Sequence, residues 1–175
     1  ESFKSVIDDI PGVESISAAT AIPGRNNNQN GYLLEGRLDE TLLIQTSWVD
    51  YDFKDVYNFE MTEGRFFDRS FPADLDACVI NESTVREYKL DKPLETVILT
   101  PGNEDGSFRQ LRVIGVTGDF HFEGLSRPVD PYIMRFRTDD LNFGYITARL
   151  DPNNKEETIN KIETVWKENT SNDPL

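Results

Sequence analysis

The stretch Leu111-Arg-Val-Ile-Gly-Val-Thr-Gly-Asp-Phe-His-Phe-Glu-Gly-Leu125 decides how we interpret the chain. Its first half is rich in β-branched residues and ends at Gly118, which is typical of a short buried strand. In the second half, acidic residues and the single histidine alternate with apolar ones, so an extended backbone would separate them onto two faces. We therefore expect the aromatic face to hold the strand exit against the core, while the polar face is either a turn or a site.

The polar face consists of Asp119, His121 and Glu123, and it is the one cluster in the sequence that suggests a metal site. Alternate residues on one strand face can ligate a metal through oxygen and imidazole groups. The competing interpretation is that Asp119 caps the turn by accepting backbone N–H groups, with His121 as a polar group beside the aromatic residues. We favour the second interpretation, because one histidine and acids without supporting ligands make a weak metal site. The sequence therefore predicts no metal and no cofactor.

Composition excludes several classes of protein. The chain of 175 residues carries 18 Lys and Arg against 32 Asp and Glu, a formal net charge of −14. Nucleic-acid binding needs clustered basic residues, and binding flat on anionic lipid needs them too, so the acidity counts against both. Hydrophobic residues make up 37% of the chain, which supports a packed core. No apolar run approaches the roughly 20 residues of a membrane-spanning helix. Because the sequence begins with Glu1 and not Met, we expect a piece of a longer protein.

Groups that carry catalysis are scarce. The sequence has one histidine, one cysteine and no glycine-rich phosphate loop. Cys78 stands in the apolar run Ala77–Ile80, so we interpret it as a small hydrophobe in a buried strand rather than a nucleophile. Arg65 is either an anion-binding residue or the partner of a local carboxylate, and in so acidic a chain we favour the second. The prediction is that the protein is not an enzyme.

Periodicity predicts the remaining elements. Helices are expected at 1–10, at 53–57 with Asp50 as its N-cap, at 82–88 with Asn81 as its N-cap, and from 151 onward. Residues 23–31, with their run of asparagines, are expected to form a surface loop, and Glu63–Gly64 a turn. Strands are expected at 13–22, 32–35, 42–49, 77–80, 95–100, 108–116, 132–136 and 144–150, with 95–100 and 108–116 as a hairpin.

Several short blocks stand in order along nearly the whole chain: Ile10-Pro-Gly-Val13, Ala21-Ile-Pro-Gly24, Val49-Asp-Tyr-Asp-Phe53, Glu63-Gly-Arg-Phe-Phe67, Val79-Ile-Asn-Glu82, Val113-Ile-Gly-Val-Thr-Gly-Asp-Phe-His121, Pro131-Tyr132 and Ile162-Glu-Thr-Val-Trp-Lys167. Taken together, they resemble the extracytoplasmic (periplasmic core) domain of MacB/FtsX-like ABC transporter permeases, in the version found in Bacteroidetes.

The resemblance implies an α+β fold with two subdomains. A porter-like α/β sandwich would be formed by both chain ends, residues 1–58 and 130–175, and a smaller β-rich subdomain by residues 59–129. It also implies structural roles for the matched motif residues. Gly64 and Arg65 would lie in a turn, Asn81 would cap a helix, and Asp119 with His121 would fix the strand exit.

The resemblance further implies a non-catalytic domain inserted between two membrane helices, on the extracytoplasmic (periplasmic) side of the bacterial inner membrane. It would couple ATP-driven movement to export or to a partner outside the membrane. Its partners would be the transmembrane helices, a cytoplasmic ATP-binding subunit, and a periplasmic protein or lipoprotein, with no nucleic acid. Two alternatives stay open: a secreted or lipid-anchored receptor that binds a ligand, and a metal-dependent hydrolase centred on Asp119 and His121.

Overall fold

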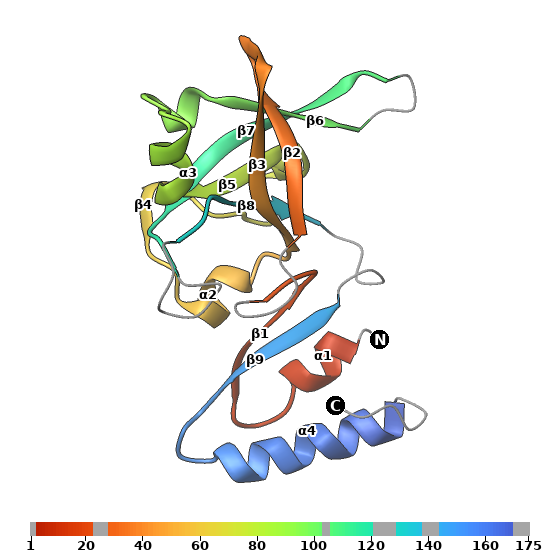
Figure 1. Ribbon diagram of the computed structural model, residues 1–175. Helices are drawn as coiled ribbons and strands as arrows, with labels where there is room; N and C mark the ends of the chain where they lie inside the picture. The colour runs from red at the N-terminus through yellow and green to blue at the C-terminus, as the bar shows by residue number, and fades with distance from the viewer. Residues whose placement is uncertain (1–2, 23–27, 103–105, 121–128, 138–143, 170–175) are drawn as a thin grey trace.

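The computed structural model describes residues 3–22, 28–102, 106–120, 129–137 and 144–169. Strands dominate it, with short helices between them (Figure 1). The fold is therefore α+β, as the sequence predicted. In chain order, with η marking a 3₁₀ helix, the elements are α1 (Phe3–Asp8), β1 (Val13–Ala19), β2 (Asn28–Leu34), β3 (Arg37–Val49), α2 (Phe53–Tyr57), β4 (Met61–Gly64), η1 (Pro72–Asp76), β5 (Ala77–Asn81), α3 (Glu82–Glu87), η2 (Pro93–Glu95), β6 (Val97–Pro101), β7 (Phe108–Thr117), β8 (Tyr132–Phe136), β9 (Tyr145–Leu150) and α4 (Lys155–Asn169).

Six of the strands pair edge to edge until they close on themselves, and we call this body the ring. Its order is β2, β6, β7, β5, β8 and β3, after which β3 returns to β2. The β3–β8 and β5–β7 pairs are parallel, whereas the other four pairs are antiparallel. Closure gives each strand of the ring a partner on both sides, which is the usual protection of a sheet against edge-to-edge association.

Apolar side chains from every strand of the ring fill its interior. They recur at every second position, because successive side chains of a strand point to opposite faces, except at the irregularity of β7 between Val113 and Val116. This cluster contains Tyr32, Leu34, Leu42, Ile44, Cys78, Ile80, Ile98, Leu111, Val113, Val116 and Ile133, with Leu90 after α3. The other face of β5 and β8 is also covered, by a second cluster that includes Phe53 of α2 and the neighbours Phe66 and Phe67. All five residues of β5 are consequently buried.

Four elements from the two ends of the chain, α1, β1, β9 and α4, form a smaller body, which we call the end unit (Figure 1). β1 and β9 pair along their length, and β1 meets the ring at Ala19, which pairs with Val49 of β3. Helix α1 lies between this two-stranded ribbon and α4 (Figure 1). The small core of the end unit consists of Ile7, Ile10 and Ile16, against which Ile162 and Val165 of α4 pack. Both ends of the described chain thus meet in one body.

Three local expectations were wrong. β2 begins at Asn28, inside the predicted loop, because the backbone from Asn28 to Leu34 pairs with β3 whatever side chains it carries. Glu63 and Gly64, predicted as a turn, end β4, which pairs with β7 beyond the stretch that β6 occupies. The N-cap of α2 is Asp52 and not Asp50, although Asp50 Oδ1 accepts the backbone N–H of Asp52 at 3.2 Å as well as its bonds from β1.

The predicted division into residues 1–58 with 130–175 and residues 59–129 stays a prediction. Strand pairing crosses both of its boundaries, because β2 pairs with β6 and β8 pairs with β5. The ring therefore combines strands from both predicted parts.

Candidate functional site

Gly64 of β4 lies opposite Gly115 of β7, and the two glycines let these paired antiparallel strands lie very close together. Gly64 has φ +67°, and a Cβ there would lie 2.2 Å from the carbonyl oxygen of Ile114. A Cβ on Gly115 would lie 2.2 Å from the carbonyl oxygen of Arg65. Any side chain at either position would push the strands apart. This close pairing fixes the point at which the chain leaves β4, and therefore the position of the next residue, Arg65.

Arg65 forms a two-pronged ion pair with Asp74 of η1. Its two terminal nitrogens lie 2.8 and 2.7 Å from the carboxylate oxygens, and Asp74 is only 1% exposed. The backbone N–H of Asp68 donates to the same carboxylate at 3.0 Å, and the Phe71 ring lies 3.8 Å from the guanidinium carbon. The hydrogen bonds to Asp74 raise the pKa of Arg65. The arrangement holds a buried carboxylate in place, as the favoured interpretation of Arg65 requires.

Asn81 joins α3 to the ring. Its Oδ1 accepts hydrogen bonds from the backbone N–H groups of Thr84, at 3.0 Å, and of Tyr132, at 2.9 Å. Its Nδ2 donates to the carbonyl oxygen of Asp130 at 2.9 Å. Because the side chain is fully buried, each of these bonds satisfies a polar group that water cannot reach. Asn81 thus caps the helix and also fixes the start of β8.

Asp119, at the exit of β7, bonds to α3. One carboxylate oxygen accepts from the backbone N–H of Ser83 at 2.8 Å, and the other pairs with Arg86. Burial pulls the pKa of Asp119 upward, but the hydrogen bonds from Arg86 and Ser83 outweigh it, so the pKa lies below its usual value. The next residue, Phe120, stacks on Phe59 with ring centres 4.2 Å apart. The strand exit is therefore held on both of its faces.

His121 and Glu123 lie outside the described residues, so the geometry of the proposed three-residue cluster is not described. Within the described ranges, no group of three or more His, Cys, Asp or Glu side chains is placed to hold a metal ion. Cys78, inside the ring, is fully buried, and burial raises the pKa of its thiol to about 12. A thiol in that state is a poor nucleophile near neutral pH.

A buried carboxylate, which the sequence suggested only as a helix cap, lies where the ring meets the end unit. Asp50, just after β3, accepts from the Ser17 hydroxyl at 2.6 Å and from the Ala18 backbone N–H at 2.9 Å, both on β1. Lys4 of α1 pairs with Asp50 and lies 2.7 Å from Asp52. We call the group Lys4, Ser17, Asp50, Asp52 and Arg69 the junction. Lys4, Ser17 and Arg69 lie far from Asp50 and Asp52 in the sequence, so no local pattern predicted that these residues would meet.

The charged side chains of the junction stabilise one another through ion pairs. Arg69 reaches Asp52 with both terminal nitrogens, at 3.0 and 2.9 Å. Burial opposes the charge on Asp52, but the hydrogen bonds from Arg69 and Lys4 outweigh it and lower its pKa. Burial likewise opposes the charge on Lys4, but its bonds to Asp50 and Asp52 prevail and raise its pKa. All three groups are therefore charged near neutral pH, and α1 is tied to the ring.

The first and last described helices also meet each other. Phe3 in the first turn of α1 packs against Trp166 near the end of α4, with ring centres 5.0 Å apart in an edge-to-face arrangement. The start of α1 and the end of α4 consequently lie on the same side of the end unit (Figure 1).

The sequence matches the family of the MacB-like periplasmic core domain over residues 2–165. The chain belongs to this family. No curated protein sequence matches it. The resemblance seen in the short sequence blocks is thereby confirmed.

Solved structures similar to this MacB-like domain share its fold. The periplasmic region of MacB from Actinobacillus actinomycetemcomitans gives a TM-score of 0.68 at 14% identity, over 95% of this chain and 72% of that one. The extracellular domain of the noncanonic ABC-type transporter YknZ from Gram-positive bacteria gives 0.67 at 13% identity, over 95% and 81%. A permease domain from Porphyromonas gingivalis gives 0.66 at 20% identity, over 95% and 75%. At such identities the likeness establishes the fold alone.

No helix within the described part of this MacB-like domain is both long and apolar enough to span a membrane. The described motif residues bind the protein's own backbone and side chains: Arg65 to Asp74, Asn81 to α3 and β8, and Asp119 to α3. The candidate functional region consists of the junction and the paired chain ends.

Proposed function

We propose that this domain is the extracytoplasmic part of an ABC transporter permease and that it transmits ATP-driven movement of membrane helices to export or to a partner outside the membrane. Family membership supports the location, and two structurally similar proteins are described as MacB and as an ABC-type transporter. The observation that carries the proposal is the contact between Phe3 and Trp166. A domain inserted between two neighbouring membrane helices needs its two ends side by side, and these ends are.

The junction gives this movement a route into the ring. A shift of α1 pulls on Asp50 and Asp52 through Lys4, and Asp50 also holds β1 through Ser17. Since the ring is closed and densely packed, it responds as one body, while the end unit supplies the hinge. In this proposal the domain has two parts, and the end unit is the one nearer the membrane.

The partners follow from the same scheme. They are the permease's own transmembrane helices, a cytoplasmic ATP-binding subunit, and a periplasmic protein or lipoprotein. The domain itself takes no catalytic step, because its polar clusters, within the described ranges, are engaged in internal hydrogen bonds.

A reversible lock on the chain ends tests the proposal in the parent permease. Phe3→Cys with Trp166→Cys replaces the two rings by thiols that a short, reducible bifunctional thiol reagent can bridge, and the parent is reconstituted in lipid with its ATP-binding subunit. We expect the bridge to lower the rate of ATP hydrolysis and a reductant to restore it, because the locked ends no longer move relative to each other. The reduced form of the same variant controls for loss of the two aromatic rings.

A second pair, Lys92→Cys with Glu95→Cys on η2, serves as the matched control. These exposed side chains already form an ion pair at 2.9 Å, far from the end unit (Figure 1). Their crosslink should leave ATP hydrolysis unchanged. Complete crosslinking of the chain ends with an unchanged rate would contradict the proposal, and so would a parent sequence without an apolar segment of about 20 residues on each side of this domain.

A further inference from the structure

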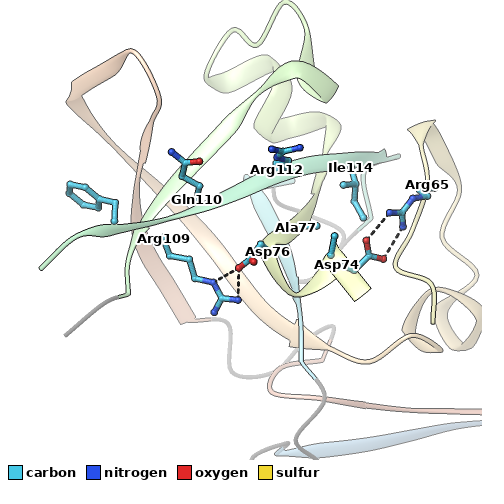
Figure 2. Close-up of a pocket in the computed structure, with 10 residues that line it drawn as sticks. Arg65, Asp74, Asp76, Ala77, Arg109, Gln110, Arg112 and Ile114 are labelled. Atoms are coloured by element: carbon cyan, nitrogen blue, oxygen red, sulfur yellow. Dashed lines mark hydrogen bonds and ion pairs between the residues drawn. The ribbon is translucent and has the colours of Figure 1, made fainter. Parts of the chain in front are cut away.

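The outer face of β7 is the floor of an open groove of about 710 Å³ (Figure 2). Phe108, Gln110, Arg112 and Ile114 contribute to its lining at every second position, on the side of the strand opposite to the ring interior. The wall opposite is η1 with the residues around it, including Asp74 and Asp76. The groove is thus a stretch of sheet surface that the helices of the domain leave uncovered.

Two of the three arginines along the groove are engaged. Arg65 is paired with Asp74, and Arg109 donates to Asp76 at 2.8 Å and to the carbonyl oxygen of Leu75 at 2.7 Å (Figure 2). The third, Arg112, is exposed, and its side chain has no hydrogen-bond or ion-pair partner among the described residues. The lining therefore has a formal charge of +1, in a chain whose formal net charge is −14.

Exposed apolar side chains gather around the same groove. Phe108 is 46% exposed at the start of its floor. Leu75, between the lining residues Asp74 and Asp76 of η1, is 47% exposed. Phe71, which packs on Arg65, is 46% exposed. Large apolar groups that border a groove and face water are a common mark of an interaction surface.

We propose that this groove binds an extended acidic segment of a partner protein, with a carboxylate on Arg112 and apolar side chains beside Phe108 and Ile114. Charge selects an acidic occupant, because the groove is a locally basic site on an acidic surface. Its open form and its length select a chain segment, since Phe108 to Ile114 span roughly 20 Å of strand. The inference deepens the proposed function, as it supplies the surface for the partner outside the membrane.

The spacing of the floor sets the pattern of the occupant. Side chains on one face of a strand recur about every 6.6 Å, so an extended peptide along β7 presents matching groups at alternate positions. Opposite Phe108, Gln110, Arg112 and Ile114, these groups are apolar, amide, acidic and apolar. The probe is therefore the acetylated and amidated peptide Leu-Thr-Gln-Thr-Glu-Thr-Leu.

Titration of this peptide into the 175-residue chain, followed by calorimetry, tests the proposal. We expect saturable binding that weakens at least about tenfold for Arg112→Gln, because the carboxylate then loses its charged partner. The same weakening is expected when the Glu of the peptide is replaced by Gln. Lys92→Gln, which removes an exposed cation from η2, should leave the affinity unchanged.

Three outcomes would overturn the inference. They are no binding at about 1 mM peptide, equal affinity for the Arg112→Gln variant, and acetate binding to Arg112 as tightly as the peptide, which would make the site one for small carboxylates. The assay needs neither membrane nor ATP. Its failure therefore leaves the chain-end lock of the proposed function untouched, and failure of the lock leaves the peptide result standing.

Discussion

The ring and the end unit differ in how many of their apolar side chains are fully buried. The ring encloses a continuous apolar cluster, with Ile80, Ile98, Leu111 and Ile133 fully buried. In the end unit, the fifteen residues of α4 contribute only one buried residue, Thr158. Local stability in a protein follows buried contacts, so the end unit is the part that opens at lower cost. A domain that passes movement from its ends to a rigid body needs this asymmetry.

The largest expected effect on stability comes from shortening a buried side chain in the interior of the ring. Ile80→Ala should lower the free energy of unfolding by about 2–5 kcal/mol, because it leaves a cavity at a fully buried position. The measurement is urea denaturation followed by circular dichroism. The comparison is with Ile16→Ala in the end unit, where we expect hydrogen exchange to accelerate in α1 and α4 while the ring keeps its protection. If Ile16→Ala accelerated exchange in the ring as much, the two bodies would form one cooperative unit.

Gly12→Ala should weaken the packing of α4 against the rest of the end unit. Gly12 has φ +99°, and a Cβ there would lie 2.1 Å from the hydroxyl oxygen of Thr158. Backbone strain and the clash together should cost about 2–3 kcal/mol, read from thermal unfolding. Gly36→Ala is the matched control, because its φ is +83° but nothing lies within 4 Å of the added Cβ. Equal losses for the two variants would mean that the contact with Thr158 contributes nothing.

Acidification should loosen the junction. The pKa of Asp52 lies below its ordinary value of 3.8 in the folded protein, so its ion pairs stabilise the fold above that value and are lost as the pH falls through the depressed pKa. Asp52→Asn should therefore cost about 1 kcal/mol near pH 7, and the cost should vanish in the acid range. Urea denaturation at a series of pH values measures this difference. Asp55→Asn, at an exposed position of α2 outside the junction, is the control for removing one carboxylate charge.

The smallest effect is expected on the outer face of α4. Glu157 pairs with Lys161 one turn later at 2.7 Å, but its side chain is 70% exposed. Such pairs are screened by water and salt, so Glu157→Gln should leave the midpoint of thermal unfolding unchanged within error. A clear loss would show that α4 depends on its own helical stability more than on its contact with α1.

The strand exit and the helix cap were accessible from the sequence because their signals are local. The β-branched run before Gly118 is the end of β7, and Asn81 immediately precedes α3, as its position before a helical pattern suggested. Asp50 was misassigned for the opposite reason. Its partners Lys4 and Ser17 lie 46 and 33 positions away, and only the folded chain brings them together.

Closure of the ring was likewise beyond the reach of sequence patterns. The period of two identifies which side chains of a strand share a face, but not which strand lies beside it. β8 lies between β3 and β5, although 82 residues separate the end of β3 from the start of β8. The sequence favoured a local carboxylate as the partner of Arg65, but it did not identify that carboxylate as Asp74, since η1 carries no periodic signal.

The burial of Cys78 has a practical consequence for experiments on this domain. It is the one thiol among the 175 residues, and it lies sealed in the ring with its proton retained. Reagents that react with thiolates will therefore not modify Cys78 in the folded protein. Fluorescent or spin probes attached to cysteines introduced on α1 and α4 can therefore report distances in the native background, without first removing a residue from the core.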